Sequence, residues 1–222
     1  MRMLLRNILE IRDETPRSAP LNMALDEALL ASARAPLLRI YRWERPAVSF
    51  GYFGKFASLA ASWPGREIVR RMTGGGIVPH GGDLTYSLII PAEHEFATNS
   101  PREIYRAVHG MIGTLFTGRG EPAALAAPPI DAGTGACFES PAEFDLLAHG
   151  RKIAGAAMRR TRDGLLLQGS IQETPDLEML RSRLASSFAP QVFRVEYTPQ
   201  QLAAAESLAA EKYATPAWTT RV

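Results

Sequence analysis

The chain has 222 residues, of which 46% are hydrophobic and 22% are charged, so it is long enough to fold around a well-packed core. Its formal net charge of +2 is too small to indicate a partner such as nucleic acid or an anionic membrane. No window approaches the roughly 18 apolar residues of a membrane span. The single Cys137 excludes an internal disulfide, and the early acid Glu10 argues against a secretory signal. We expect a cytoplasmic protein.

The first half of the chain predicts one helix followed by strands. Residues 21–34 (LNMALDEALLASAR) carry an apolar stripe at helical spacing. Three short strands are predicted next, at residues 36–43 (PLLRIYRW), 47–54 (AVSFGYFG) and 66–72 (REIVRRM). A fourth, DLTYSLII, alternates so that Leu84, Tyr86, Leu88 and Ile90 share one face.

The second half begins with a helix whose start is well defined. Ser100 can cap it, Pro101 occupies the first helical position and Glu103 completes a capping box. Residues 118–135 are rich in Gly, Ala and Pro and predict a loop. A strand at residues 144–160, a turn at Asp163 and Gly164, a strand at residues 165–171 and two C-terminal helices, the second starting at Thr198, complete the chain. These elements predict an α+β fold with a mixed β-sheet flanked by helices, in a single domain over residues 1–222.

Three consecutive glycines, residues 74–76, lie between two predicted strands and follow Arg70 and Arg71. They match neither a phosphate-binding loop with its GK[ST] ending nor a dinucleotide fingerprint, which opens a helix. Without Cβ atoms a ligand can lie directly against the backbone, whose N–H groups can bind an anion. Only one of the two arginines can readily face the same site, because neighbouring strand residues point to opposite faces. The alternative is a tight turn with solvated arginines.

Lys152 and Cys137 are the candidate catalytic side chains. Lys152 stands among small and apolar residues of a predicted strand, from which its ammonium can reach a carbonyl or carboxylate in a cleft. The alternative is an ordinary strand lysine that extends to water. Cys137 is either a thiolate nucleophile or a small buried residue. None of the four histidines has metal-ligand spacing, so we expect no metal site.

Four segments in order resemble the biotin/lipoate protein ligase family, in particular its lipoate–protein ligase and octanoyltransferase branch. They are residues 22–30 (NMALDEALL), LLRIYRWERPAVSFGYFGK, RRMTGGGIVPHGGDLTYS, and DLLAHGRKIAGAAMRR with LLLQGSI. The resemblance implies a catalytic α+β domain without the C-terminal accessory domain of longer ligases. By matching positions it implies that Lys152 contacts the acyl carbonyl, that Asp145 lies near the adenylate end, and that the acyl-adenylate is lined by Arg71, Thr73, Gly74, Gly75, Gly76 and His80.

The resemblance implies acyl transfer to one lysine of a lipoyl carrier domain, either a 2-oxoacid dehydrogenase E2 subunit or the glycine-cleavage carrier protein. In the ligase, lipoate is activated with ATP and Mg²⁺ to lipoyl-adenylate. In the alternative, an octanoyltransferase without cofactor takes octanoyl from octanoyl-acyl carrier protein through a thioester on Cys137, in a matching Cys-Phe segment. The intact triple glycine favours the ligase, although Gly81 follows His80 where many ligases have aspartate, with Asp83 two places further on. A biotin ligase and a non-catalytic lipoyl-domain binder are weaker alternatives.

Overall fold

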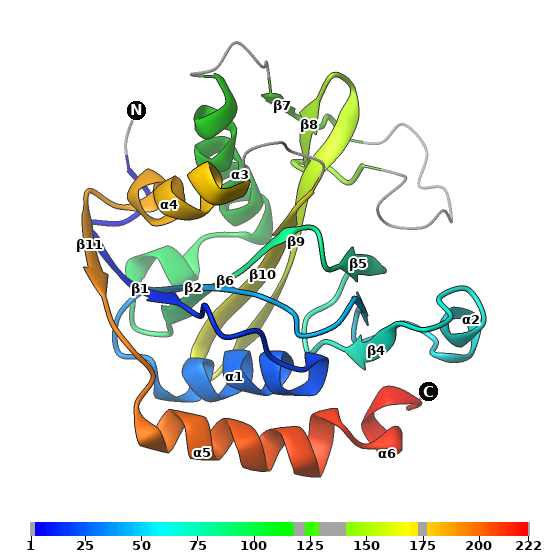
Figure 1. Cartoon of the computed structure of the whole chain (residues 1–222). Helices are drawn as coiled ribbons and strands as arrows, with labels where there is room; N and C mark the ends of the chain where they lie inside the picture. The colour runs from blue at the N-terminus through cyan, green and yellow to red at the C-terminus, as the bar shows by residue number, and fades with distance from the viewer. Residues whose placement is uncertain (1–2, 118–122, 129–140, 173–176, 222) are drawn as a thin grey trace.

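The computed structural model describes residues 3–117, 123–128, 141–172 and 177–221 (Figure 1). The strands are β1 (Asn7–Arg12), β2 (Leu37–Tyr41), β3 (Ala47–Phe50), β4 (Glu67–Arg70), β5 (Val78–His80), β6 (Leu84–Pro91), β7 (Ala123–Leu125), β8 (Leu146–Ala148), β9 (Arg151–Thr161), β10 (Gly164–Ile171) and β11 (Gln191–Arg194). The helices are α1 (Ala19–Ser32), α2 (Ala57–Ala60), α3 (Pro101–Thr117), α4 (Leu177–Phe188), α5 (Pro199–Leu208) and α6 (Pro216–Thr219), with short helical turns η1 (Glu95–Thr98) and η2 (Ala209–Tyr213).

Two sheets form the centre of the molecule. The larger has the strand order β11-β1-β2-β6-β10-β9-β8-β7, and the smaller has the order β4-β3-β5. Strands β11, β1 and β2 run parallel, whereas β2, β6, β10, β9, β8 and β7 pair antiparallel in turn. In the small sheet β3 is parallel to β4 and antiparallel to β5. The predicted α+β class with a mixed sheet is therefore confirmed.

Helices cover both faces of the large sheet. Figure 1 shows α3 and α4 on one side, and α1 with α5 on the other. Leu84, Tyr86, Leu88 and Ile90 all belong to the buried cluster that packs against α3 and α4, as the alternation of β6 predicts. The opposite residues of β6, such as Thr85 and Ser87, are buried and face α1, so the α1 side of the sheet carries polar groups.

The predicted helix starts agree with the structure. Ser100 and Glu103 exchange the hydrogen bonds of a capping box, and Thr198 forms the same motif with Gln201 ahead of α5. One predicted strand is wrong in part, because residues 144–160 do not form a continuous strand. His149 (φ 49°) and Gly150 (φ 76°) both adopt left-handed backbone and turn β8 back into β9. Lys152 consequently stands one residue into β9, directly after a tight turn.

No helix in the described ranges combines the length and the apolar character needed to cross a membrane.

Candidate functional site

A cavity opens on the α1 side of the large sheet, and residues of the small sheet and of β9 and β10 line it. Met23 of α1 and Tyr41 of β2 are buried apolar side chains of its lining. Six of the predicted site residues also line it, namely Arg71, Gly75, Gly76, His80, Asp145 and Lys152.

The three glycines belong to a loop of residues 72–76, here called the glycine loop, which connects β4 to β5. It lies close against the end of β3: the N–H of Tyr52 donates to the carbonyl of Thr73 at 2.8 Å. A Cβ atom on Gly51 would overlap the carbonyl oxygen of Gly75. Gly75 itself has φ 81°, a left-handed conformation that favours glycine. This arrangement therefore requires glycine at position 75 of the loop and at position 51, which faces it after β3.

Arg71 holds the glycine loop in its shape. Its Nη2 donates to the carbonyls of Gly74 (3.0 Å) and Gly76 (2.9 Å), and its Nη1 donates to the hydroxyl of Ser49 (2.7 Å). In a trans peptide the C=O and the following N–H point in opposite directions, so the N–H of Gly75 points away from this guanidinium. Arg70 faces the other way, toward the C-terminal residues, as expected for neighbours on a strand.

Lys152 forms an ion pair with Asp145 in the cavity wall. Its Nζ lies 2.7 Å from Oδ2 of Asp145, and the two side chains are only 9% and 6% exposed. The same carboxylate oxygen accepts from the N–H of Ala142 at 2.7 Å. A Cβ on Gly155 would approach Cε of Lys152 to 2.7 Å and Oδ1 of Asp145 to 3.0 Å. The absence of a side chain at position 155 therefore gives the amine its place beside the carboxylate.

His80 lies at the centre of a chain of hydrogen bonds. Its Nε2 is 2.7 Å from Oγ of Ser49, and its Nδ1 is 2.8 Å from Oδ2 of Asp83. Since Arg71 donates to the Ser49 hydroxyl, this hydroxyl can donate its own proton to Nε2. The indole of Trp43 stacks on the imidazole with ring centroids 4.1 Å apart.

Asp83, three positions after His80 in the chain, therefore supplies the carboxylate beside the imidazole. Thr85 and Ser170 each donate a hydrogen bond of 2.7 Å to its Oδ2. Burial alone would raise the pKa of Asp83, but the interaction with His80 and these hydrogen bonds outweigh burial and lower the pKa below its usual value.

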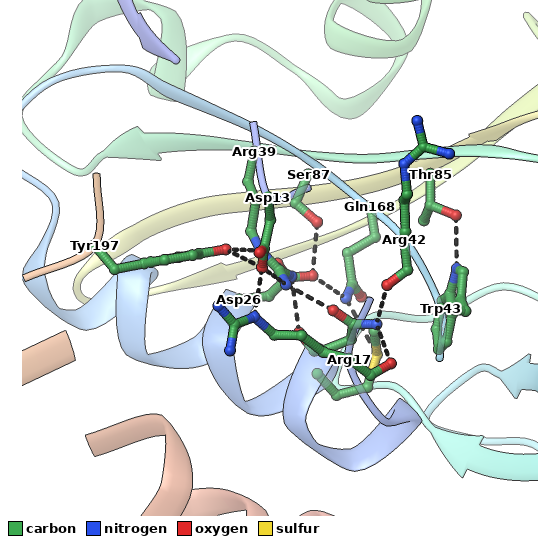
Figure 2. A network of polar contacts seen from close by, with 12 residues as sticks. Asp13, Arg17, Asp26, Arg39, Arg42, Trp43, Thr85, Ser87, Gln168 and Tyr197 are labelled. Carbon is green, nitrogen blue, oxygen red and sulfur yellow. Dashed lines mark hydrogen bonds and ion pairs between the residues drawn. The ribbon is translucent and has the colours of Figure 1, made fainter. Parts of the chain in front are cut away.

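Thr73 is fully buried, and its hydrogen-bond partner Gln168 belongs to a second polar network, which Figure 2 shows. Its hydroxyl donates to Oε1 of Gln168 at 2.7 Å, and Nε2 of Gln168 donates to Oδ2 of Asp26 at 2.7 Å. Asp26 also accepts from Ser87 and from Arg39, at 2.6 and 2.9 Å. The carboxylate of α1 thus fixes the Gln168 amide in the orientation that accepts from Thr73.

Arg39 anchors this network in the core. It is fully buried, and its five N–H groups donate to Tyr197, to Asp26, to Asp13, and to the backbone and side-chain oxygens of Asn22. Burial opposes its charge, but Tyr197, Asp26 and Tyr41 outweigh burial and raise the pKa of Arg39. The charge is therefore retained inside the protein and ties α1 to β2 and to the segment before α5.

Sequence reasoning missed Ser49, Gln168, Asp26 and Arg39. One signal was present: Asn22 and Asp26 are polar residues four apart on one face of a mainly apolar helix. Among the predicted residues, Gly74 has open space where a Cβ would stand. Cys137 lies outside the described residues. Within the described ranges no group of three His, Cys, Asp or Glu side chains is arranged to hold a metal ion.

Comparison with known proteins identifies the family of this chain. The chain belongs to the lipoyl protein ligase A/B catalytic domain family, whose model matches residues 18–203. It is 40% identical to octanoyltransferase LipM of Oceanobacillus iheyensis over 177 residues, which cover 76% of this chain and 65% of that protein. It is 31% identical to octanoyltransferase LipM of Bacillus anthracis, with coverage of 88% and 82%. The chain thus spans a little under two thirds of the first of these relatives.

Solved structures share the fold at lower identity. A T. acidophilum protein solved with bound lipoic acid superposes with a TM-score of 0.77 at 21% identity, covering 98% of this chain and 99% of that chain. A lipoate-protein ligase A solved with ATP superposes with a TM-score of 0.74, also at 21% identity, covering 97% of this chain and 98% of that chain. These likenesses establish the α+β fold of the family.

Proposed function

We propose that this chain transfers a medium-length acyl group, octanoyl or lipoyl, to a specific lysine of a lipoyl carrier domain. The observation that carries the proposal is that the paired amine of Lys152 and the backbone of Gly75 and Gly76 line the same cavity. An acyl transfer site needs a cation or N–H donors where negative charge develops on the carbonyl oxygen. It also needs an apolar space for the chain, which Met23 and Tyr41 help to form.

In this proposal Lys152 and the glycine loop act on the acyl carbonyl. The ammonium of Lys152 stabilises the oxyanion, and Asp145 holds the ammonium in position. The N–H of Gly75 is the second candidate donor, because Arg71 binds the preceding carbonyl and so turns this N–H away from itself. His80, Ser49 and Asp83 keep Arg71 oriented.

We infer that the donor is an octanoyl thioester. The relatives that are 31–40% identical to this chain are named octanoyltransferases, whereas the ATP-bound neighbour is 21% identical and supports the fold alone. In this route the thiolate of Cys137 attacks the thioester carbonyl and expels the donor's thiolate, which then takes up a proton from water. The acceptor lysine, as a free amine, then attacks the cysteine thioester, which forms the amide, releases a proton and restores the thiolate.

An ATP-dependent ligase is the second candidate, favoured by the intact triple glycine. Among the described residues that line the cavity, Asp145 is the one carboxylate, and it is already paired with Lys152. Magnesium that accompanies nucleotides is usually held by one or two carboxylates and by the phosphates. Asp145 could serve only if this ion pair opened, so the described residues fit a thioester donor better than Mg-ATP.

One experiment distinguishes the two candidate acyl donors. The purified protein is incubated with an apo lipoyl domain and either octanoyl-acyl carrier protein or lipoate with Mg-ATP, and the mass of the acceptor is measured. We expect modification only with the carrier protein, and its loss in Cys137→Ser. Modification only with lipoate and ATP, unchanged in Cys137→Ser, would show that the acyl donor is lipoate activated by ATP and not an octanoyl thioester. No modification in either mixture would contradict acyl transfer itself.

A further inference from the structure

Arg70 joins the C-terminal residues to the loop that follows β3. It is 1% exposed, and its five N–H groups all donate to backbone carbonyls. The acceptors are the carbonyls of Trp218 (3.0 Å), Tyr52 (2.6 Å), Gly54 (2.8 Å), Thr219 (3.0 Å) and Arg221 (2.6 Å). In Figure 1 the C-terminal end accordingly lies next to β4. The loop and the C-terminal residues are therefore held together by Arg70 as one unit.

This unit carries positive charge that the described residues do not neutralise. The guanidinium of Arg221 lies 4.3 Å from the centroid of the Tyr52 ring, and that of Arg159 lies 4.8 Å from it. No carboxylate of the described chain forms an ion pair with Arg70, Arg159 or Arg221. Arg39, equally buried, is by contrast paired with two aspartates. Burial and the nearby Arg221 lower the pKa of Arg70, as expected for a cation without a counter-charge.

Phe53 projects from the same unit into water. It is 88% exposed, and its ring contacts Tyr52 edge-on with centroids 5.1 Å apart. The carbonyls on either side of it, those of Tyr52 and Gly54, are both held by Arg70. A single exposed aromatic residue is not unusual. An aromatic residue on a fixed loop among arginines has the composition of an interface anchor.

The surface of Tyr52, Phe53, Arg159 and Arg221, here called the Phe53 surface, adjoins the glycine loop, part of which lines the cavity. Tyr52 donates its N–H to the carbonyl of Thr73, and Arg159 donates to the carbonyl of Met72 at 3.0 Å. Both acceptors belong to the glycine loop, whose Gly75 is exposed and lines the cavity. A protein bound at Phe53 would therefore lie beside the exposed part of that loop.

We propose that the Phe53 surface docks the folded acceptor domain, with carboxylates of that domain facing the arginines around an apolar contact with Phe53. The inference rests on the proposed function. The partner at this surface is the acceptor domain, because both candidate donors, the thioester and the free acid, deliver the acyl group to that domain. The acceptor is also a protein in either case. A cluster of arginines without counter-charges selects an acidic partner and steers its approach. Docking here should therefore weaken as the salt concentration rises.

The test uses Phe53, which is exposed, and Arg221, which is partly exposed, and neither side chain makes a hydrogen bond to the glycine loop. Phe53→Ser removes the apolar anchor, and Arg221→Glu reverses a charge while keeping the backbone carbonyl that Arg70 binds. Phe193→Ser and Arg183→Glu are the matched controls, because Phe193 is 53% exposed on β11 and Arg183 is exposed on α4. All four variants should keep the thermal stability of the parent protein.

We expect each Phe53-surface variant to raise the KM for the apo lipoyl domain about tenfold, with kcat within about twofold. The controls should leave both constants unchanged. Transfer to hydroxylamine, a small nucleophile that needs no docking, should not change in any variant. A KM for the domain within about twofold of the parent value, or a rise in the KM of the acyl donor instead, would overturn the docking proposal.

A binding measurement makes this result independent of turnover. NMR titration of the isotope-labelled apo lipoyl domain with the parent protein, without any donor, should give a Kd that the two variants raise about tenfold. Equal affinity of parent and variants would overturn the docking proposal even if transfer is normal. Failure of the parent protein to acylate both the domain and hydroxylamine would instead contradict the proposed function, whatever the titration shows.

Discussion

Gly51 and Gly155 are positions where a single methyl group would disturb the cavity. A Cβ on Gly51 would meet the backbone of the glycine loop, which cannot rotate out of the way as a side chain can. A Cβ on Gly155 would meet Lys152 and Asp145, the two charged groups of the cavity wall. In both cases the added methyl group would disturb the cavity because it has no room, and no reactive side chain would be changed.

Gly51→Ala should therefore destabilise the fold as well as reduce activity. Overpacking costs about 1–3 kcal/mol, which corresponds to a fall in Tm of about 3–10 °C for a domain of this size. Gly74→Ala is the control, because no atom lies within 4 Å of the Cβ position there. Thermal unfolding followed by circular dichroism compares the two. Equal Tm values would show that the glycine loop does not depend on its contact with β3.

Asp83 gives the site a defined pH dependence of stability. Its pKa in the folded protein lies below the ordinary value of 3.8, so its stabilisation is present above that value and is lost as the pH falls through the folded pKa. Asp83→Asn should be less stable than the parent at about pH 7, and the difference should shrink below about pH 4. Urea unfolding across this range measures it. A difference that stays constant with pH would contradict the assigned role of the carboxylate.

At the scale of elements, the network around Arg39 joins helix α1 to the sheet. Asn22 and Asp26 come from α1, Arg39 from β2, Ser87 from β6 and Gln168 from β10. Asp26 binds both the core cation and the Gln168 amide that holds Thr73. The position of α1 against the sheet and the shape of the glycine loop are thus set by the same carboxylate.

Removal of one partner of this buried pair should be costly. Arg39→Met should lower the free energy of unfolding by about 3–5 kcal/mol, because the buried Asp26 is left without its cation, whereas Asp13 keeps its ion pair with Arg17. Combining it with Asp26→Leu should cost less than the sum of the two single changes, by at least about 1 kcal/mol. Chemical denaturation of the four proteins gives this coupling. Additive effects would mean that the two side chains do not act as a pair.

Part of this arrangement could be predicted from the sequence. The capped start of α3, the alternation of β6 and the start of α5 are local patterns, and all three agree with the structure. The tight turn at His149 was missed because left-handed histidine is uncommon and its neighbours suit a strand. Arg39 was missed because a charged residue in a strand does not reveal that its partners lie on a helix and before α5.

At the scale of the whole molecule, the site depends on residues from both ends of the chain. Strand β11 extends the parallel ladder beside β1, and Tyr197 after it donates to Asp13. The C-terminal residues reach Arg70, next to the glycine loop. The sequence predicts only packing helices for this region. Such long-range contacts have no local pattern, which is why the sequence alone places the glycine loop but not what surrounds it.

In the proposed function, the amine of Lys152 acts on an acyl group held beside the glycine loop. The most direct test is the single-turnover rate of acyl transfer to the lipoyl domain by Lys152→Ala, with Tm measured to show that the fold persists. We expect the rate to fall by about 10²–10³-fold, as for loss of one oxyanion donor. Gly155→Ala, which displaces the amine without removing it, should also lose activity. A Lys152→Ala rate within about twofold of the parent would contradict the central claim.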